Sequence, residues 1–316
     1  MAIDKVVDST VLDGYFTDIA DAIRFKNGAA AQYTPAQMPS AIKAIVSNKT
    51  PIKNASSLFY FGENWPYFNG FDFTTGDLEN CEKMFHQCFI IGSSVTSLDL
   101  SDWDVSNVVR FNEMFSECHT LETIDLSNWD TSTAWTMEEM FSGCFNLRTI
   151  IGIEDFDFSS FVAGSNGTLD GMFKECQSLQ TLDLSNWNVD NVGGFYSMFE
   201  YSTIGNLDIS TWVCPNARNT DNMFYYNPAT SLDLSSFAPQ GTGYGGTFSC
   251  SNMFSHCYDL QYLDLSSLDA SKIGNSSGMF DSCSMVQTAY CRSAADKAIL
   301  DQIVIDSGQS WTFTVK

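Results

Sequence analysis

A motif of alternating apolar and polar residues recurs along most of the chain. It reads L-x-x-L-D-L-S-x-W-D-x-S-x-V and is followed, after a variable stretch, by M-F-x-x-C. In its clearest copy Ile124 and Leu126 alternate with Thr123, Asp125 and Ser127, which is the period of a β-strand. A strand this short is not stable alone. We therefore expect the copies to pair side by side in one parallel ladder, with the apolar residues facing inward.

Met-Phe pairs set the length of the repeat. The pairs begin at Met84, Met114, Met140, Met172, Met198, Met223, Met253 and Met279, at intervals of 25 to 32 residues. A period in this range is typical of solenoids, in which each unit buries its apolar face against its neighbours. The apolar spacing within Met-Phe-x-x-Cys favours a helical turn that packs back on the strands. The pattern predicts an α/β repeat solenoid of about eight coils.

The template closely resembles the BspA-type leucine-rich repeats of bacteria and their phages. The resemblance spans about residues 58–316 and implies leucine-rich-repeat-like coils that serve adhesion or protein interaction rather than catalysis. We expect the solenoid at residues 58–287 and a C-terminal cap at residues 288–316. Within the cap, the sequence predicts a short helix around residues 294–303 and a closing strand.

Two further slots of the repeat hold large or soft apolar side chains. Tryptophan follows the serine of the strand at a fixed distance in several copies, and we expect it in the core. Most of the ten cysteines follow the Met-Phe pair, and Ser202 and Asn227 fill the same slot in two copies. A slot that accepts serine and asparagine favours a buried ladder of reduced cysteines. Neighbouring coils would nevertheless bring the thiols close enough for disulfides.

Residues 1–46 lack the repeat and form a separate N-terminal segment. Apolar residues at helical spacing predict one amphipathic helix, and Thr34-Pro35-Ala36-Gln37 predicts the start of a second. We expect this small helical domain to serve anchoring or oligomerisation, with residues 47–57 as a linker to the solenoid. The residues expected to dock to the partner are Leu12, Phe16, Ile19, Ile23, Met38 and Ile42. Residues 16–45 resemble N-terminal segments of phage tail and other virion proteins, which implies docking to a virus particle.

Charge and composition narrow the classes of partner. The chain has 15 basic and 38 acidic residues, a net charge of −23, which repels phosphate backbones and anionic lipids. No apolar run is long enough to span a membrane, and Asp4 and Asp8 interrupt the start where a secretory signal needs apolar residues. We expect no nucleic-acid binding, no membrane insertion and no recognisable export signal. These features favour a virion protein assembled in the host cytoplasm over a protein of the bacterial cell surface.

No motif indicates catalysis, a cofactor or a metal site. The three histidines lie in different copies of the repeat, without a nucleophile and an orienting acid beside them. No glycine-rich phosphate loop is present, and the cysteine spacings are too wide for a zinc knuckle. We expect the protein not to be an enzyme and to need no cofactor.

Candidate binding residues fall into two groups. From the first inward strand residue to the next Met-Phe phenylalanine is 17 residues in regular copies, but 23 from Ile150 to Phe173 and 22 from Leu232 to Phe254. Inserted loops often bind partners, so their aromatic residues are candidate affinity groups: Phe156, Phe158, Phe161, Tyr244 and Phe248. The alternative is that some of these rings pack the insertions onto the core. The second group is a column of outward strand carboxylates: Asp99, Asp125, Asp183, Asp208, Asp233 and Asp264. Like charges on adjacent strands destabilise a sheet. We expect hydroxyl groups, water, cations or a basic partner to compensate them.

The sequence as a whole predicts a virion protein of a tail tip, fibre or head fibre. Its N-terminal helices would dock to other virion proteins, with the chain as a homo-oligomer on the particle. Its solenoid would bind a protein or glycan of the host surface. The alternative is a bacterial leucine-rich-repeat surface adhesin or interaction protein.

Overall fold

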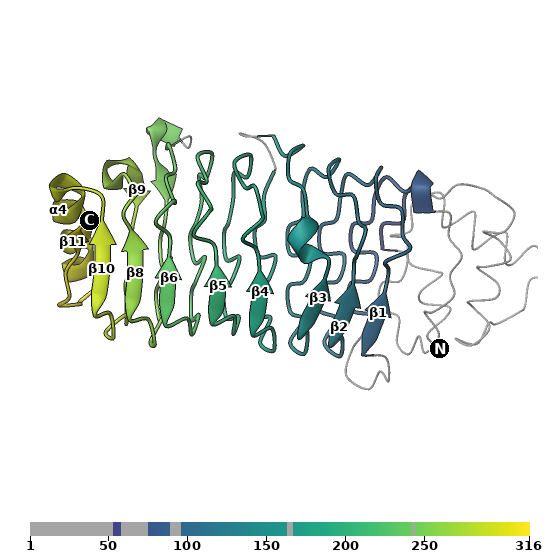
Figure 1. Cartoon of the computed structure of the whole chain (residues 1–316), viewed down its shortest axis with the longest axis horizontal. Coiled ribbons are helices and arrows are strands. Elements are labelled where there is room, and N and C mark those ends of the chain that lie inside the picture. Colours follow the sequence, from purple (N-terminus) through teal and green to yellow (C-terminus); the bar gives the residue numbers. More distant parts are fainter. Residues whose placement is uncertain (1–52, 58–74, 89–95, 163–166, 242–243) are drawn as a thin grey trace, which may run out of the picture.

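The computed structural model describes residues 53–57, 75–88, 96–162, 167–241 and 244–316 (Figure 1). These residues form a parallel β-solenoid of about eight turns with little helix, which confirms the predicted repeat architecture. The predicted N-terminal helices and their docking residues lie outside the described part of the chain.

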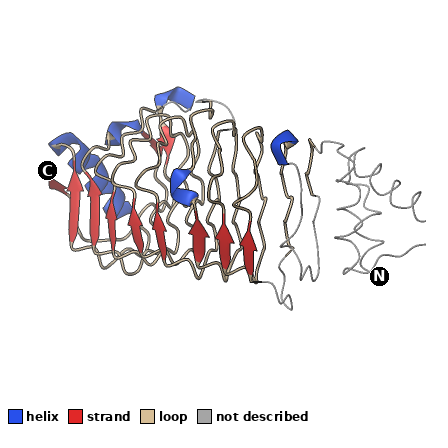
Figure 2. Ribbon diagram, turned by 45° about the vertical axis from the view of Figure 1, so that its right-hand side comes forward, coloured by secondary structure: helices blue, strands red, loops and turns tan. Residues whose placement is uncertain are grey.

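One short strand per coil forms a row along one side of the solenoid (Figures 1 and 2). The strands are β1 (Ser97–Asp99), β2 (Thr123–Asp125), β3 (Thr149–Ile151), β4 (Thr181–Asp183), β5 (Asn206–Asp208), β6 (Ser231–Asp233), β8 (Tyr262–Leu265) and β10 (Thr288–Cys291). They pair in parallel within three groups, β1-β2-β3, β4-β5 and β6-β8-β10, and β11 (Thr314–Val315) extends the last group. The central residue of the paired strands is buried, as at Leu98 and Ile124, so the predicted alternation is confirmed.

A second line of parallel pairing runs along the residues just before the Met-Phe pairs. It consists of single bridges such as Arg110 to Thr136 and of β7 (Phe248–Ser249) paired with β9 (Ile273–Asn275). Short 3-10 turns complete the corners: η1 (Thr75–Asp77), η2 (Ile153–Asp155), η3 (Tyr244–Gly246) and η4 (Ala270–Lys272).

The Met-Phe-x-x-Cys segments are not helical turns, and our expectation of helix there was wrong. The residue before the methionine and the residue two after the phenylalanine have positive φ, for example 52° at Glu113 and 61° at Glu117. A right-handed helix cannot pass through such residues. Their N–H groups donate to the next coil instead, as from Glu117 to the carbonyl of Ser142 at 2.7 Å. Cross-coil hydrogen bonds therefore take the place of intrahelical ones.

Stacked aromatic rings fill the core from coil to coil. The phenylalanines of the Met-Phe pairs stack with centroids 5.4 to 5.9 Å apart and planes within 13° of each other. A second stack follows the tryptophan slot, and its rings are buried as predicted. The Trp129 Nε1–H donates to the carbonyl of Leu100 in the preceding coil at 3.0 Å, so the ring is also fixed by a hydrogen bond.

All ten cysteines are buried and free, in agreement with the expected reduced ladder. The thiol of Cys118 donates to the carbonyl of Phe85, and that of Cys144 to the carbonyl of Phe115, each at 3.1 Å. Ser202 and Asn227 occupy the same slot in two neighbouring coils, and both are buried. Their polar groups are satisfied by a hydrogen bond between them, in which Asn227 Nδ2 donates to Ser202 Oγ at 3.1 Å.

The C-terminal residues cover the last coil with a helix and a strand, as predicted. Helix α4 (Ala294–Asp306) begins at Ser293, whose hydroxyl accepts from the N–H of Asp296. After the helix, the Trp311 ring packs on Phe280 with centroids 5.0 Å apart, and its Nε1–H donates to the carbonyl of Cys283 at 2.8 Å. The cap therefore closes the Phe stack at its end.

Candidate interaction surface

The outward strand aspartates all make the same contact within their own coil. The Oδ1 atom of each accepts a hydrogen bond from the backbone N–H of the serine two residues later: Asp99, Asp125, Asp183, Asp208, Asp233 and Asp264. The Ser101 hydroxyl also donates to Asp99, at 2.7 Å. This hydroxyl bond and the backbone bond lower the pKa of the Asp99 carboxyl. The aspartates thus shape the turn at the strand end, and serine groups compensate their charge.

The column of carboxylates is interrupted along the row of strands. Ile151 occupies the position in β3, paired with Asp125, and Tyr290 occupies it in β10, paired with Asp264. Asp264 is itself buried. Burial alone would raise the pKa of Asp264, but hydrogen bonds from Lys316 and Ser266 outweigh it and lower the pKa. Six repeated turn residues are therefore in place, but they do not converge on one site.

The aromatic residues assigned to the insertions are mostly core residues, and the expectation that they are exposed affinity groups was wrong. The exposed fractions are 4% for Phe156, 1% for Phe158, 2% for Phe161 and 2% for Phe248. Phe156 fills the tryptophan slot of its coil, with its ring 6.4 Å from those of Trp129 and Trp187 and nearly parallel to both.

Phe158 packs edge-on against Trp187 at 4.6 Å, and Phe161 packs against Phe158 at 5.3 Å. Phe248 meets the ring of Phe237 edge-on at 6.2 Å. The sequence contained a signal for the buried position of Phe156, because Phe156-Asp157 aligns with Trp129-Asp130. This alignment places the first insertion after Phe156 and not around it. Tyr244 begins η3, and its side chain lies outside the described residues.

A cluster of exposed and half-buried aromatic residues lies at the corner after the Met-Phe pairs of three successive coils. We call this cluster the aromatic corner: Tyr201, Tyr225, Tyr226, His256 and Tyr258. The Tyr226 ring is sandwiched between those of Tyr201 and His256, with centroids 4.8 and 4.4 Å away and planes within 18°. Tyr225 and Tyr258 stand nearly perpendicular to Tyr226. Exposed fractions of 39% for Tyr201 and 50% for Tyr258 leave this cluster open to a partner.

The stacked members of the corner share one slot, two residues after the phenylalanine of the pair. The slot has positive φ, with 54° at Tyr201, 56° at Tyr226 and 62° at His256. Left-handed backbone is unfavourable for bulky side chains. This corner was not among the binding residues predicted from the sequence. The signal was present, because aligning the copies puts three aromatic residues in one column.

Carboxylates border the aromatic corner. Glu175 occupies the same slot one coil earlier, and its N–H donates to the carbonyl of Glu200, the residue before Tyr201. On the other side, the N–H of His256 donates to the carbonyl of Asp281 at 2.7 Å. Asp259 follows Tyr258 and is exposed. The local charge therefore has the same sign as that of the whole chain.

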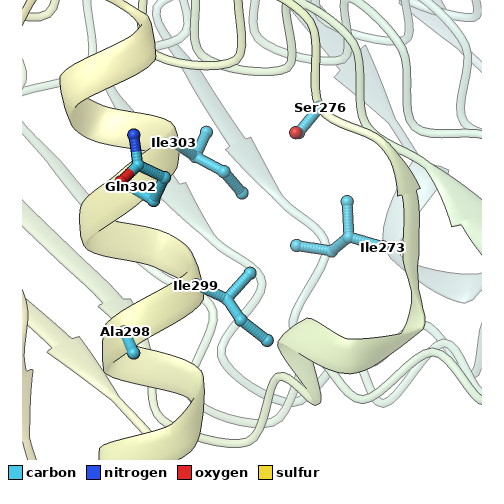
Figure 3. A pocket seen from close by; sticks show the side chains of 6 residues that line it. All are labelled: Ile273, Ser276, Ala298, Ile299, Gln302 and Ile303. Carbon is cyan, nitrogen blue, oxygen red and sulfur yellow. The ribbon is translucent and has the colours of Figure 1, made fainter.

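An open, mostly apolar pocket of about 470 Å³ lies between β9 and α4 (Figure 3). Ile273 faces Ile299 and Ile303 of the helix across it, and Ser276 and Gln302 are polar residues at its wall. No titratable side chain lines this pocket, so it offers no acid, base or nucleophile.

No group of three or more His, Cys, Asp or Glu side chains in the described ranges could hold a metal ion. In the same part of the chain, no helix is both long and apolar enough to cross a membrane.

Comparison with known proteins identifies a family for the repeat. Residues 53–166, 152–237 and 248–292 match the family described as Mycoplasma protein of unknown function, DUF285. No curated protein matches the chain. Among solved structures, the chain is similar to a leucine-rich-repeat protein of Leptospira interrogans at 11% identity and a TM-score of 0.17, over 75% of this chain and 73% of the other. Since the matched segments cover well over half of its length, the chain belongs to the DUF285 family.

Proposed function

We propose that this chain is an attachment protein of a bacteriophage virion, whose solenoid binds a molecule of the host surface. The observation that carries the binding role is the aromatic corner. Tyr201 and Tyr258 are exposed beside half-buried Tyr225 and Tyr226, and protein interfaces are enriched in tyrosine. The interior of the described coils is filled by stacked rings and thiols, so the recognition groups must lie on the surface.

The location on a virion rests on the sequence. Residues 16–45 resemble N-terminal segments of phage virion proteins, and the repeat resembles the BspA-type leucine-rich repeats. In this proposal the N-terminal helices dock to other virion proteins and the chain is a homo-oligomer on the particle. A bacterial surface adhesin is the second candidate, because BspA-type repeats also serve adhesion.

Localisation separates the two candidates. Antibodies against the solenoid should detect the chain in particles purified from lysed cultures, and deletion of residues 1–46 should remove it from them. The truncated chain should stay folded, because coils of a solenoid bury their core against each other. Detection only on the surface of intact, uninfected cells would replace the virion proposal by the adhesin.

The binding role is tested separately with purified protein. Fluorescently labelled full-length chain should bind cells of the bacterium that the phage infects, and an excess of unlabelled chain should reduce phage adsorption. Absence of binding to those cells, with the chain present in particles, would contradict an attachment role.

A further inference from the structure

We propose that the aromatic corner is the binding site of the solenoid and that its ligand is a protein segment carrying arginine or lysine. This inference rests on the proposed attachment function, and it names the chemistry of the partner. Three features carry it: the stacking of aromatic residues from three successive coils, the rigidity of the cluster and its charge.

The aromatic residues share one slot of the repeat in three consecutive coils. The backbone there is not peculiar to the corner, because the slot has positive φ in the other Met-Phe coils too, where Gln87, Glu117, Gly143, Glu175 and Ser282 fill it. Tyr201, Tyr226 and His256 differ from those residues in carrying aromatic rings, which stack on one another at the surface. Aromatic residues are enriched at protein interfaces, so a surface stack that spans three coils indicates a binding surface.

The cluster is held rigid before any ligand arrives. The N–H of Tyr201 donates to the carbonyl of Tyr225 at 2.9 Å, and that of Tyr226 to the carbonyl of Ser255 at 3.1 Å. The Ser255 hydroxyl also bonds the Nδ1 of His256 at 2.8 Å. Rigid rings lose little conformational entropy on binding, which favours affinity.

The shape of the cluster favours a charged side chain over a sugar. Neighbouring rings cover both faces of Tyr226, at 4.8 and 4.4 Å, so this ring presents its edge to solvent. A pyranose ring packs on an exposed aromatic face. An arginine instead lays its aliphatic stem along ring edges and donates its N–H groups to phenol and carboxylate oxygens.

Charge selects the partner further. Glu175, Glu200, Asp259 and Asp281 lie at the border of the corner, and Lys174 pairs with Glu200 at 3.3 Å. The chain carries a net charge of −23, which attracts a basic segment and repels a second copy of the chain. The occupant is therefore a basic segment of a different protein.

The test uses two peptides of identical length, one with four arginines spaced by glycine and serine, the other with citrulline at the same positions. Citrulline keeps the shape of arginine without its charge. Binding to the full-length chain is measured by fluorescence anisotropy at near-physiological salt. We expect the arginine peptide to bind at least about tenfold more tightly, equivalent to about 1.4 kcal/mol.

Variants separate the corner from the overall charge. The triple variant Tyr201→Ser, Tyr226→Ser, Tyr258→Ser leaves the net charge unchanged and should weaken arginine-peptide binding about tenfold or more. The matched control is Trp135→Ser with Tyr196→Ser, which removes rings that are 55% and 42% exposed outside the corner, and it should bind like the wild type. If the triple variant unfolds by circular dichroism, Glu175→Gln with Asp281→Asn tests the same site with every ring in place.

Several outcomes would overturn the inference. Equal binding by wild-type and corner variants would reduce the effect to net charge. Binding of neutral oligosaccharides that is lost in the triple variant, without arginine-peptide binding, would assign the corner to glycans. Host cells that bind wild-type and corner variants equally would refute this site while leaving the attachment function intact. Failure of the wild-type chain to bind host cells, with peptide binding still dependent on the corner, would refute the attachment function alone.

Discussion

The cysteine slot illustrates how one coil constrains single residues of the next. The thiols of Cys118 and Cys144 donate to carbonyl groups of the preceding coil, so the slot selects a small side chain with a donor. Ser202 satisfies the same requirement through its own coil, with its hydroxyl 2.9 Å from the carbonyl of Phe199. Burial disfavours the charged thiolate and raises the pKa of Cys176, which lies in this slot.

We predict that the thiols are unreactive in the folded protein. Because the thiolate is the nucleophile, iodoacetamide at pH 8 should modify almost none of the ten cysteines in native buffer. In urea without a reducing agent it should modify all ten. Mass spectrometry of the labelled chain gives the count. Thiols that stay unlabelled in urea until reductant is added would show disulfides and contradict the reduced ladder.

Asp170 gives a prediction about pH. Its carboxylate accepts the N–H of Tyr196 at 2.7 Å, yet burial raises its pKa to about 6, and Glu138 and Glu139 add to the rise. A carboxyl whose pKa is higher folded than unfolded contributes stability below its unfolded pKa, near 3.8, and loses it as the pH rises through 6. We expect Asp170→Asn to be more stable than wild type at pH 7.5, by about 1–3 kcal/mol.

The pH dependence of this difference is the decisive measurement. Urea unfolding of both proteins from pH 4 to pH 8 should show the gap shrinking toward pH 4, where the wild-type carboxyl is protonated when folded. Asp99→Asn is the control, because its hydrogen bonds with Ser101 lower the pKa of its carboxyl, and it should not stabilise the protein at pH 7.5. A gap independent of pH would show that charge on Asp170 is not the cause.

At the scale of the element, the strands and the cap were predictable and the turns were not. The alternation around Ile124 determines a strand because one face must be buried, and the capping residue Ser293 and the apolar pattern after it determine α4. The helical turn predicted for the Met-Phe segments was wrong because their apolar spacing fits a helix as well as a turn. Glutamate is not a residue type that indicates positive φ, so the sequence did not predict it at Glu113 or Glu117. The aromatic corner was missed because its rings come together only when coils stack.

The end of β3 contains a turn that only glycine suits. Gly152 has φ of 84°, and a Cβ atom there would lie 2.8 Å from backbone atoms of Leu126 and Ser127. We expect Gly152→Ala to lower the free energy of unfolding by at least about 2 kcal/mol, from strain plus backbone overlap. Gly308→Ala is the matched control, because φ is 72° there but no atom lies within 4 Å of the added Cβ. Equal losses in thermal melts would show that the overlap is relieved at no cost.

The rings of the first insertion can be assigned to the core or to a binding loop by stability. Phe156 lies within the tryptophan stack, so Phe156→Ala should cost about 3–5 kcal/mol in urea unfolding. Trp135, which is 55% exposed, supplies the comparison, and Trp135→Ala should change stability by about 0.5 kcal/mol or less. A Phe156→Ala variant as stable as wild type would return this ring to the loop assignment of the sequence analysis.

At the scale of the whole molecule, stability is a sum over coils and their interfaces, and the two ends are the exceptions. The repeat solenoid could be predicted because the same pattern recurs in each of the described coils. The outward position of the strand aspartates could be predicted from the alternation of the strands. Their function in the turn could not, because it depends on the hydrogen bond to the serine two residues later. The end of the solenoid depends on Trp311 and Phe313, whose packing on Phe280 follows from the three-dimensional arrangement.

We predict that the cap keeps the chain monomeric in its solenoid part. Deleting residues 293–316 would uncover Phe280, which is fully buried, and leave the edge of β10 unpaired where β11 now lies. Exposed apolar surface beside a free strand edge promotes association. We expect this deletion to associate, and it is tested in a chain that already lacks residues 1–46. Size-exclusion chromatography with light scattering should show larger species for the double deletion, whereas the chain that lacks only residues 1–46 should have the mass of a monomer.

Phe313→Ala tests the packing of the cap without exposing the edge of β10. It should lower the free energy of unfolding by about 3–5 kcal/mol and leave the molecular mass unchanged. If the cap deletion kept the mass and melting temperature of the chain that lacks only residues 1–46, the last coil would be stable with its core exposed, and nearest-neighbour burial could not be what holds this solenoid together.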